Sequence, residues 1–180
     1  MSSLFAPLLR NFANRYDYDV GYVEEMNDTA PGTLWRYLLA SVFGQYRRAA
    51  PVDAYFAAKI TATKVQDCGP CLRLVCNMAL EAGVDEGKLA AILREDYDNL
   101  TEATGLAVQF ANAVCQRDAE AEMACRERLL DVCGEAAIPD LAIAIAYGGF
   151  YPTLKRGLGR AHACAPVLQE LEARLQGAAS

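Results

Sequence analysis

Histidine is almost absent from this 180-residue chain, whose only one is His162. Of its seven cysteines, Cys68 and Cys71 form the one close pair, whereas a structural zinc site usually takes four ligands in two such pairs. The sequence therefore predicts no metal and no cofactor. His162 lies far along the chain from the cysteine pair, and we interpret it as a surface or helix-end residue.

The chain also lacks a basic excess and a long apolar run. With 23 acidic and 17 basic residues its net charge is −6, whereas nucleic acids and anionic membranes both require a basic face. The longest apolar stretch, residues 141–150, is far shorter than the roughly 20 residues that span a bilayer. The N-terminus lacks the basic lead-in and cleavage pattern of a signal peptide. We therefore expect a soluble, cytoplasmic protein with neither a nucleic-acid nor a membrane partner.

Strand alternation is missing as well, which predicts an all-α protein. Apolar residues instead recur at three- and four-residue steps, and glycine or proline breaks divide the chain into about eight to ten helices. Because no linker or repeat interrupts the sequence, we expect a single domain over residues 1–180. It would comprise a helical extension (1–50), a core (about 51–160) and a C-terminal helix (161–180).

Two apolar segments predict a homo-oligomer. The segment 141–150 is apolar on all sides, which indicates a helix buried within one protomer or between protomers. The segment 34–43 carries an apolar cluster, for which we favour core packing over an oligomer contact: Trp35, Tyr37, Leu38, Leu39, Val42 and Phe43. Since hydrophobic residues make up 53% of the chain, a single protomer is not expected to cover both segments.

The motif from Asp67 to Cys71 predicts a reaction. The apolar periodicity after it indicates a helix that Asp67 would cap, and Pro70 is tolerated in a first helical turn. The positive end of the helix dipole favours a thiolate, so Cys68 is expected to be the more acidic thiol. The remaining cysteines are interpreted as small buried hydrophobic residues: Cys76, Cys115, Cys125, Cys133 and Cys164.

Three charged residues near this motif are candidate modulators of the thiol pKa. Lys64 and Lys59 precede Cys68 by four and nine residues, and an ammonium near a thiol lowers its pKa. The negative charge of Asp67 would instead raise the thiol pKa. The alternative is that both lysines are solvated charges on a helix face.

The segment from Lys59 to Cys71, with the small-residue helix that follows it, resembles the AhpD-like and carboxymuconolactone decarboxylase superfamily. The resemblance covers about residues 53–95, extends in helix layout to about 160 and is absent from the N-terminal extension. It implies an all-helical, homo-oligomeric protein in which Cys68 and Cys71 cycle between dithiol and disulfide. It also implies a small-molecule hydroperoxide, or a thiol or disulfide redox partner.

Two positions depart from the redox members of that superfamily. Val75 stands where they have a histidine and Phe56 where they have a glutamate, both of which belong to a proton relay. Of the functional residues of that superfamily, only the two cysteines therefore have counterparts here, Cys68 and Cys71. Without a positioned base, reaction with peroxide is expected to be slow at neutral pH and to rise toward alkaline pH.

Three functions remain open at this point. The first is a thiol-dependent oxidoreductase that reduces a hydroperoxide or exchanges disulfides, with Cys68 attacking and Cys71 resolving, or the reverse. The second is a non-catalytic helical oligomer or redox sensor that lost the relay. The third is a decarboxylase-like lyase, which would leave the cysteine pair without a role.

Overall fold

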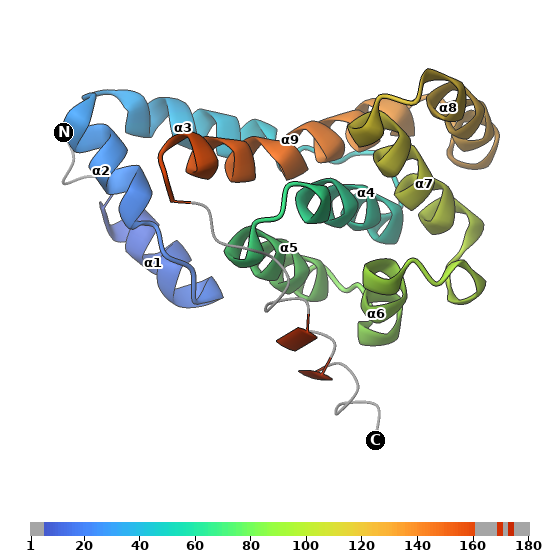
Figure 1. Ribbon diagram of the computed structural model, residues 1–180, viewed down its shortest axis with the longest axis horizontal. Coiled ribbons are helices and arrows are strands. Elements are labelled where there is room, and N and C mark those ends of the chain that lie inside the picture. The colour runs from blue at the N-terminus through green and yellow to red at the C-terminus, as the bar shows by residue number, and fades with distance from the viewer. Residues whose placement is uncertain (1–5, 161–168, 171–172, 175–180) are drawn as a thin grey trace.

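The computed structural model describes residues 6–160, 169–170 and 173–174, and all regular structure within them is helical (Figure 1). This confirms the predicted all-α class, and the nine α-helices of the described residues fall within the expected eight to ten. In chain order the elements are α1 (Ala6–Tyr16), α2 (Gly21–Thr29), α3 (Thr33–Phe43), α4 (Val52–Val65), α5 (Gly69–Glu81), α6 (Glu86–Arg94), the 3₁₀ turn η1 (Tyr97–Asn99), α7 (Glu102–Gln116), α8 (Ala119–Cys133) and α9 (Ala137–Gly157). Most of the predicted C-terminal helix, with His162 and Cys164, lies outside the described residues.

Helix α4 is the centre of the core. Every residue from Ala54 to Thr63 is buried, and α5, α6, α7 and α9 all pack against this helix. Its many alanines and threonines allow those neighbours to approach on all sides, as expected for a helix without a polar face. The largest fully buried apolar side chains of this core come from α4 itself and five other helices: Ile60, Leu72, Leu89, Ile92, Leu93, Val108, Leu129 and Leu141.

Helices α4 and α9 approach each other closely at Gly148. A Cβ atom at Gly148 would lie 2.6 Å from the carbonyl oxygen of Lys59 and 2.8 Å from the Cβ of Ala62. At the same place the Thr63 hydroxyl donates to the Gly148 carbonyl at 3.0 Å. One face of the apolar segment 141–150 is thus buried within the protomer, while Phe150 on another face is 39% exposed.

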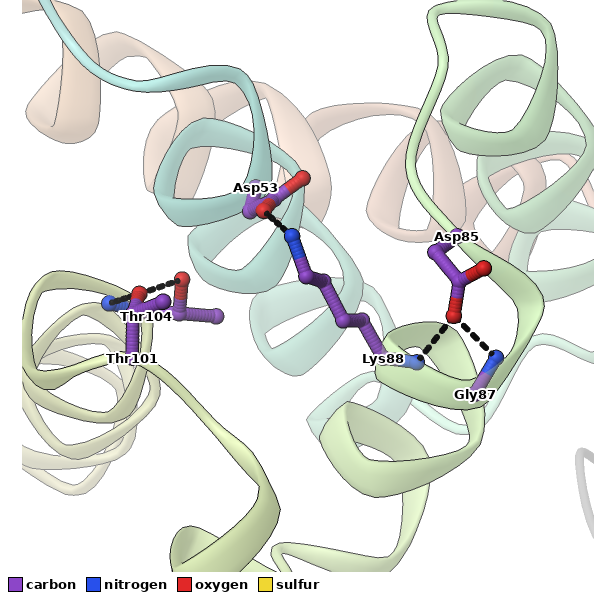
Figure 2. A network of polar contacts seen from close by, with 6 residues as sticks. All are labelled: Asp53, Asp85, Gly87, Lys88, Thr101 and Thr104. Carbon is purple, nitrogen blue, oxygen red and sulfur yellow. Dashed lines mark hydrogen bonds and ion pairs between the residues drawn. The ribbon is translucent and has the colours of Figure 1, made fainter.

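Side-chain caps begin α6 and α7 and help position them (Figure 2). The Asp85 carboxylate accepts hydrogen bonds from two N–H groups in the first turn of α6, at 2.8 and 3.3 Å. Thr101 accepts from the N–H of Thr104 at 3.3 Å in the same way. The Lys88 ammonium lies 2.6 Å from the Asp53 carboxylate and so connects α6 to the first turn of α4.

The N-terminal extension forms a second apolar cluster with Leu74 of α5 and Leu154 of α9. Its buried members come from α1 to α3 and the turns between them: Leu9, Tyr18, Val20, Tyr22, Val23 and Leu34. The core-packing interpretation of the α3 cluster is wrong for four of its six members, which are 42 to 73% exposed: Trp35, Leu39, Val42 and Phe43. Helical periodicity identifies a common face but does not determine what covers it.

Candidate redox site

Cys68 and Cys71 lie at the start of α5. Cys68 is the N-cap residue in an extended conformation, and its carbonyl accepts from the N–H of Leu72 at 2.9 Å. Pro70 occupies the first turn, as predicted. The predicted cap is displaced by one residue, because Asp67 precedes the N-cap in a left-handed conformation (φ 50°) and Cys68 makes no side-chain capping bond.

The two sulfur atoms lie 2.7 Å apart. This separation exceeds the roughly 2.05 Å of a disulfide bond, so the structure describes two thiols in hydrogen-bond contact. Both side chains are buried, with Cys68 0% and Cys71 3% exposed. A small shift of either sulfur would therefore suffice for a disulfide to form.

The surroundings shift the pKa values of the two thiols in opposite directions. The hydrogen-bond contact with the Cys71 side chain lowers the pKa of Cys68, and the Cys71 N–H, Lys155 and Arg156 add to this effect against the opposing effect of burial. The same hydrogen bond and burial raise the pKa of Cys71. Cys68 is therefore the more acidic thiol, and Cys71 retains its proton.

The cations beside the pair are not the ones that the sequence suggested. The Lys59 ammonium donates to the Gly44 carbonyl at 2.8 Å, and its side chain is buried rather than solvated. The Lys64 ammonium is directed toward α6, where it donates to the Leu93 carbonyl at 2.9 Å and pairs with Glu95 at 3.1 Å.

The end of α9 supplies the positive charge instead. Lys155 and Arg156 both favour the Cys68 thiolate. Arg156 donates to the carbonyl of Gln66, two residues before Cys68, which holds its guanidinium near the pair. Since these residues follow the motif by almost 90 positions, no local spacing in the sequence could have identified them.

Tyr18 and Lys155 form a second feature that the sequence did not predict. The Tyr18 hydroxyl contacts the Cys71 sulfur at 3.7 Å, and the Lys155 ammonium lies 3.4 Å from that hydroxyl. Lys155 is 3% exposed and lies 4.7 Å and 4.8 Å from the ring centroids of Tyr18 and Tyr22, within cation–π range. Burial raises the pKa of Tyr18 well above its ordinary value, so its phenol holds a proton at neutral pH. The only signal in the sequence was a cluster of tyrosines at positions 16, 18 and 22.

The positions of the family relay provide no replacement base. Val75 and Phe56 are both buried apolar residues. Within the described part of the chain, no three histidine, cysteine, aspartate or glutamate side chains lie close enough together to hold a metal ion.

The other described cysteines differ from the pair in their burial or in their thiol pKa. Cys76, in the same helix as the pair, is fully buried, which agrees with its predicted role as a small hydrophobic residue. Three more are only half-buried, although they pack against the same core: Cys115, Cys125 and Cys133. Burial raises the pKa of each of these three thiols, which makes them poorer nucleophiles than Cys68.

A cavity of about 260 Å³ adjoins the site. Tyr18, whose hydroxyl contacts Cys71, lines this cavity together with Val75, and the rest of the wall is mostly apolar. Ser41, Lys59 and Tyr151 are among its few polar lining residues. The Tyr18 side chain thus contacts both the thiol pair and a small-molecule-sized space.

Comparison with family models, curated proteins and solved structures found no match to this chain. Among the described residues, none of the helices has the length and apolar character that crossing a bilayer requires. Proposals about function therefore rest on the geometry of the site itself.

Proposed function

We propose that this protein is a thiol-dependent oxidoreductase in which Cys68 and Cys71 reduce a small hydroperoxide and become a disulfide. The observation that carries the proposal is the 2.7 Å contact between the two sulfurs, which lowers the pKa of Cys68 and raises the pKa of Cys71. An acidic thiol beside a protonated one is the arrangement that an attacking and a resolving cysteine require. The resemblance to AhpD-like alkylhydroperoxidases agrees with this function.

In the first step, the Cys68 thiolate attacks the terminal oxygen of the hydroperoxide. The O–O bond breaks, Cys68 becomes a sulfenic acid, and the departing alkoxide takes the proton of the Tyr18 hydroxyl. Tyr18 recovers a proton from Cys71, whose sulfur is its 3.7 Å neighbour. This transfer gives Tyr18 and Lys155 the part of the relay that Val75 and Phe56 cannot supply.

In the second step, the Cys71 thiolate attacks the sulfur of Cys68. The S–O bond breaks and hydroxide leaves, taking up the proton that Cys68 released when it ionised. The products are one disulfide, one alcohol and one water, and the two thiols have supplied two electrons. An external dithiol would restore the pair by exchange.

Burial of both sulfurs favours a small oxidant over a protein disulfide. With Cys68 0% and Cys71 3% exposed, a disulfide on another protein could not reach either atom in this conformation. The same burial supports a second candidate, a redox sensor that is oxidised once and reduced slowly. Repeated turnover with a dithiol reductant distinguishes an enzyme from a sensor.

We also propose that the chain forms a homo-oligomer through the exposed face of α3. Trp35, Leu39, Val42 and Phe43 follow helical spacing on that face, and Phe43 packs against Tyr147 of α9. Interface cores between identical subunits are enriched in aromatic residues and depleted of charge. A second copy of the chain is therefore the proposed cover. A reducing cytoplasmic compartment suits a protein in which Cys68 and Cys71 are both thiols.

A thiol titration after peroxide treatment tests the redox function. Wild-type protein should lose two thiols per chain with cumene hydroperoxide or hydrogen peroxide and recover both with dithiothreitol. Cys68→Ser and Cys71→Ser should each abolish this reversible loss of two thiols, whereas the matched control Cys125→Ser should retain it. A dominant disulfide at any other pair, or peroxide consumption by the double Cys68→Ser/Cys71→Ser variant, would refute the proposal.

A further inference from the structure

The cavity beside the thiol pair has the dimensions and wall of a ligand site. Its volume of about 260 Å³ lies just below the about 300–1,000 Å³ usual for small-molecule sites. Side chains of α1, α3 and α5 make its wall apolar, among them Leu9, Phe12, Leu38, Leu74 and Met78.

Among the described residues, Lys59 is the one cationic residue in this wall. Its side chain is 4% exposed, and its ammonium donates to the Gly44 carbonyl at 2.8 Å and the Tyr55 hydroxyl at 3.4 Å. Both acceptors are neutral, and no carboxylate in the described part of the chain forms an ion pair with Lys59. A buried ammonium without an anion carries an uncompensated desolvation cost.

Asp140, an acidic residue that raises the pKa of Tyr55 in the same region, directs one carboxylate oxygen to other groups, while the second, Oδ1, is buried without a hydrogen-bond partner among the described residues. Its carboxylate accepts hydrogen bonds from the backbone N–H groups of residues 48, 49 and 50 at 2.6 to 2.8 Å. Burial alone lowers the pKa of Lys59 to about 8, with no carboxylate counteracting it. Lys59 therefore remains mostly cationic at neutral pH and would gain from an anion that enters the cavity.

We propose that this cavity binds a small amphipathic carboxylate, with the Lys59 ammonium pairing with the carboxylate and the apolar wall covering an alkyl chain. One cation matches one negative charge, which favours a carboxylate over a doubly charged phosphate ester. The inference depends on the cavity and on Lys59 and does not require the cysteines to be redox-active. An experiment can therefore refute carboxylate binding without refuting the thiol chemistry, and the reverse is also true.

Calorimetric titration with decanoate and 1-decanol, below their aggregation concentrations, tests the inference. Wild-type protein should bind decanoate at least tenfold more tightly than decanol, because only decanoate can form a charge-assisted hydrogen bond. Lys59→Met should weaken decanoate binding at least tenfold and change decanol binding by less than twofold. The matched control Lys88→Met, at a lysine that lies outside the cavity, should leave both affinities unchanged.

A cavity-filling variant locates the bound chain. Leu74→Trp should weaken both probes, while the Cys68→Ser/Cys71→Ser protein should bind decanoate as the wild type does. Equal binding of decanoate and decanol by the wild type, or no binding of either, would overturn the inference without any variant having to fold. Unchanged decanoate affinity in a folded Lys59→Met protein would also overturn it.

Discussion

The Lys155 ammonium lies 3.4 Å from the Tyr18 hydroxyl, although 137 residues separate them in the sequence. Tyr18 in turn contacts the sulfur of Cys71. The N-terminal extension, which the family resemblance does not cover, thus supplies a side chain to the site, and Lys155 near the end of α9 contacts that side chain.

Tyr18→Phe should slow the reaction with hydroperoxide by about tenfold or more, because it removes the proposed proton donor to the departing alkoxide. The ring remains, so Lys155 retains its cation–π contact and the free energy of unfolding should change by only about 1 kcal/mol. Stopped-flow oxidation of the thiols measures the rate. Tyr46→Phe, at an exposed tyrosine, is the control, and equal rates for the two variants would remove Tyr18 from the mechanism.

Cys68 should ionise well below the ordinary thiol pKa of about 8.5, since the Cys71 hydrogen bond, Lys155 and Arg156 all favour its thiolate. A lowered pKa means that the thiolate is already populated at neutral pH. The rate of peroxide reaction should then be nearly constant from pH 7 to pH 9, rather than rising as the missing histidine and glutamate suggest. Thiolate absorbance against pH gives the pKa directly.

The matched variant Cys71→Ala removes the hydrogen bond and should raise the pKa of Cys68. Its rate with peroxide should then increase with pH through the neutral range. An unchanged titration curve would show that Cys71 is not the cause of the acidity.

Gly148→Ala should destabilise the protein by about 2 kcal/mol, because the new Cβ would lie 2.6 Å from the Lys59 carbonyl oxygen. Gly149→Ala is a matched control in the same helix, since its Cβ would meet nothing closer than 3.8 Å. It should be neutral or stabilising, as alanine favours a helix over glycine. Chemical denaturation of both variants measures the difference, and equal stabilities would contradict the close packing of α4 and α9.

Leu39→Glu combined with Val42→Glu should convert the proposed oligomer to a monomer, since it places two charges on the exposed face of α3. Sedimentation velocity at micromolar concentration measures the change. Met123→Glu alters an equally exposed apolar residue on α8 and should leave the oligomer intact. A monomeric wild-type protein would reject the interface altogether.

Local pattern was sufficient to predict the helices and the position of the thiol pair. Apolar spacing reports the helical period directly, and the proline after Cys68 is compatible with a first turn, so α4 and α5 follow from the amino-acid sequence alone. The exception is the cap at Asp67, where a left-handed residue shifts the helix start by one position.

Tertiary structure alone decided which groups surround the sulfurs. Lys59 and Lys64 are near the motif in sequence but point toward Gly44 and Glu95. The position of a residue on a helix determines the direction of its side chain, but it does not determine which group lies in that direction. Tyr18 contacts Cys71, and Lys155 contacts Tyr18 from the other end of the chain, through packing of the N-terminal extension on α9. Such long-range contacts leave no periodic trace in a sequence. The exposure of α3 has the same origin, since an apolar face is visible in the sequence whereas its cover depends on where other helices lie.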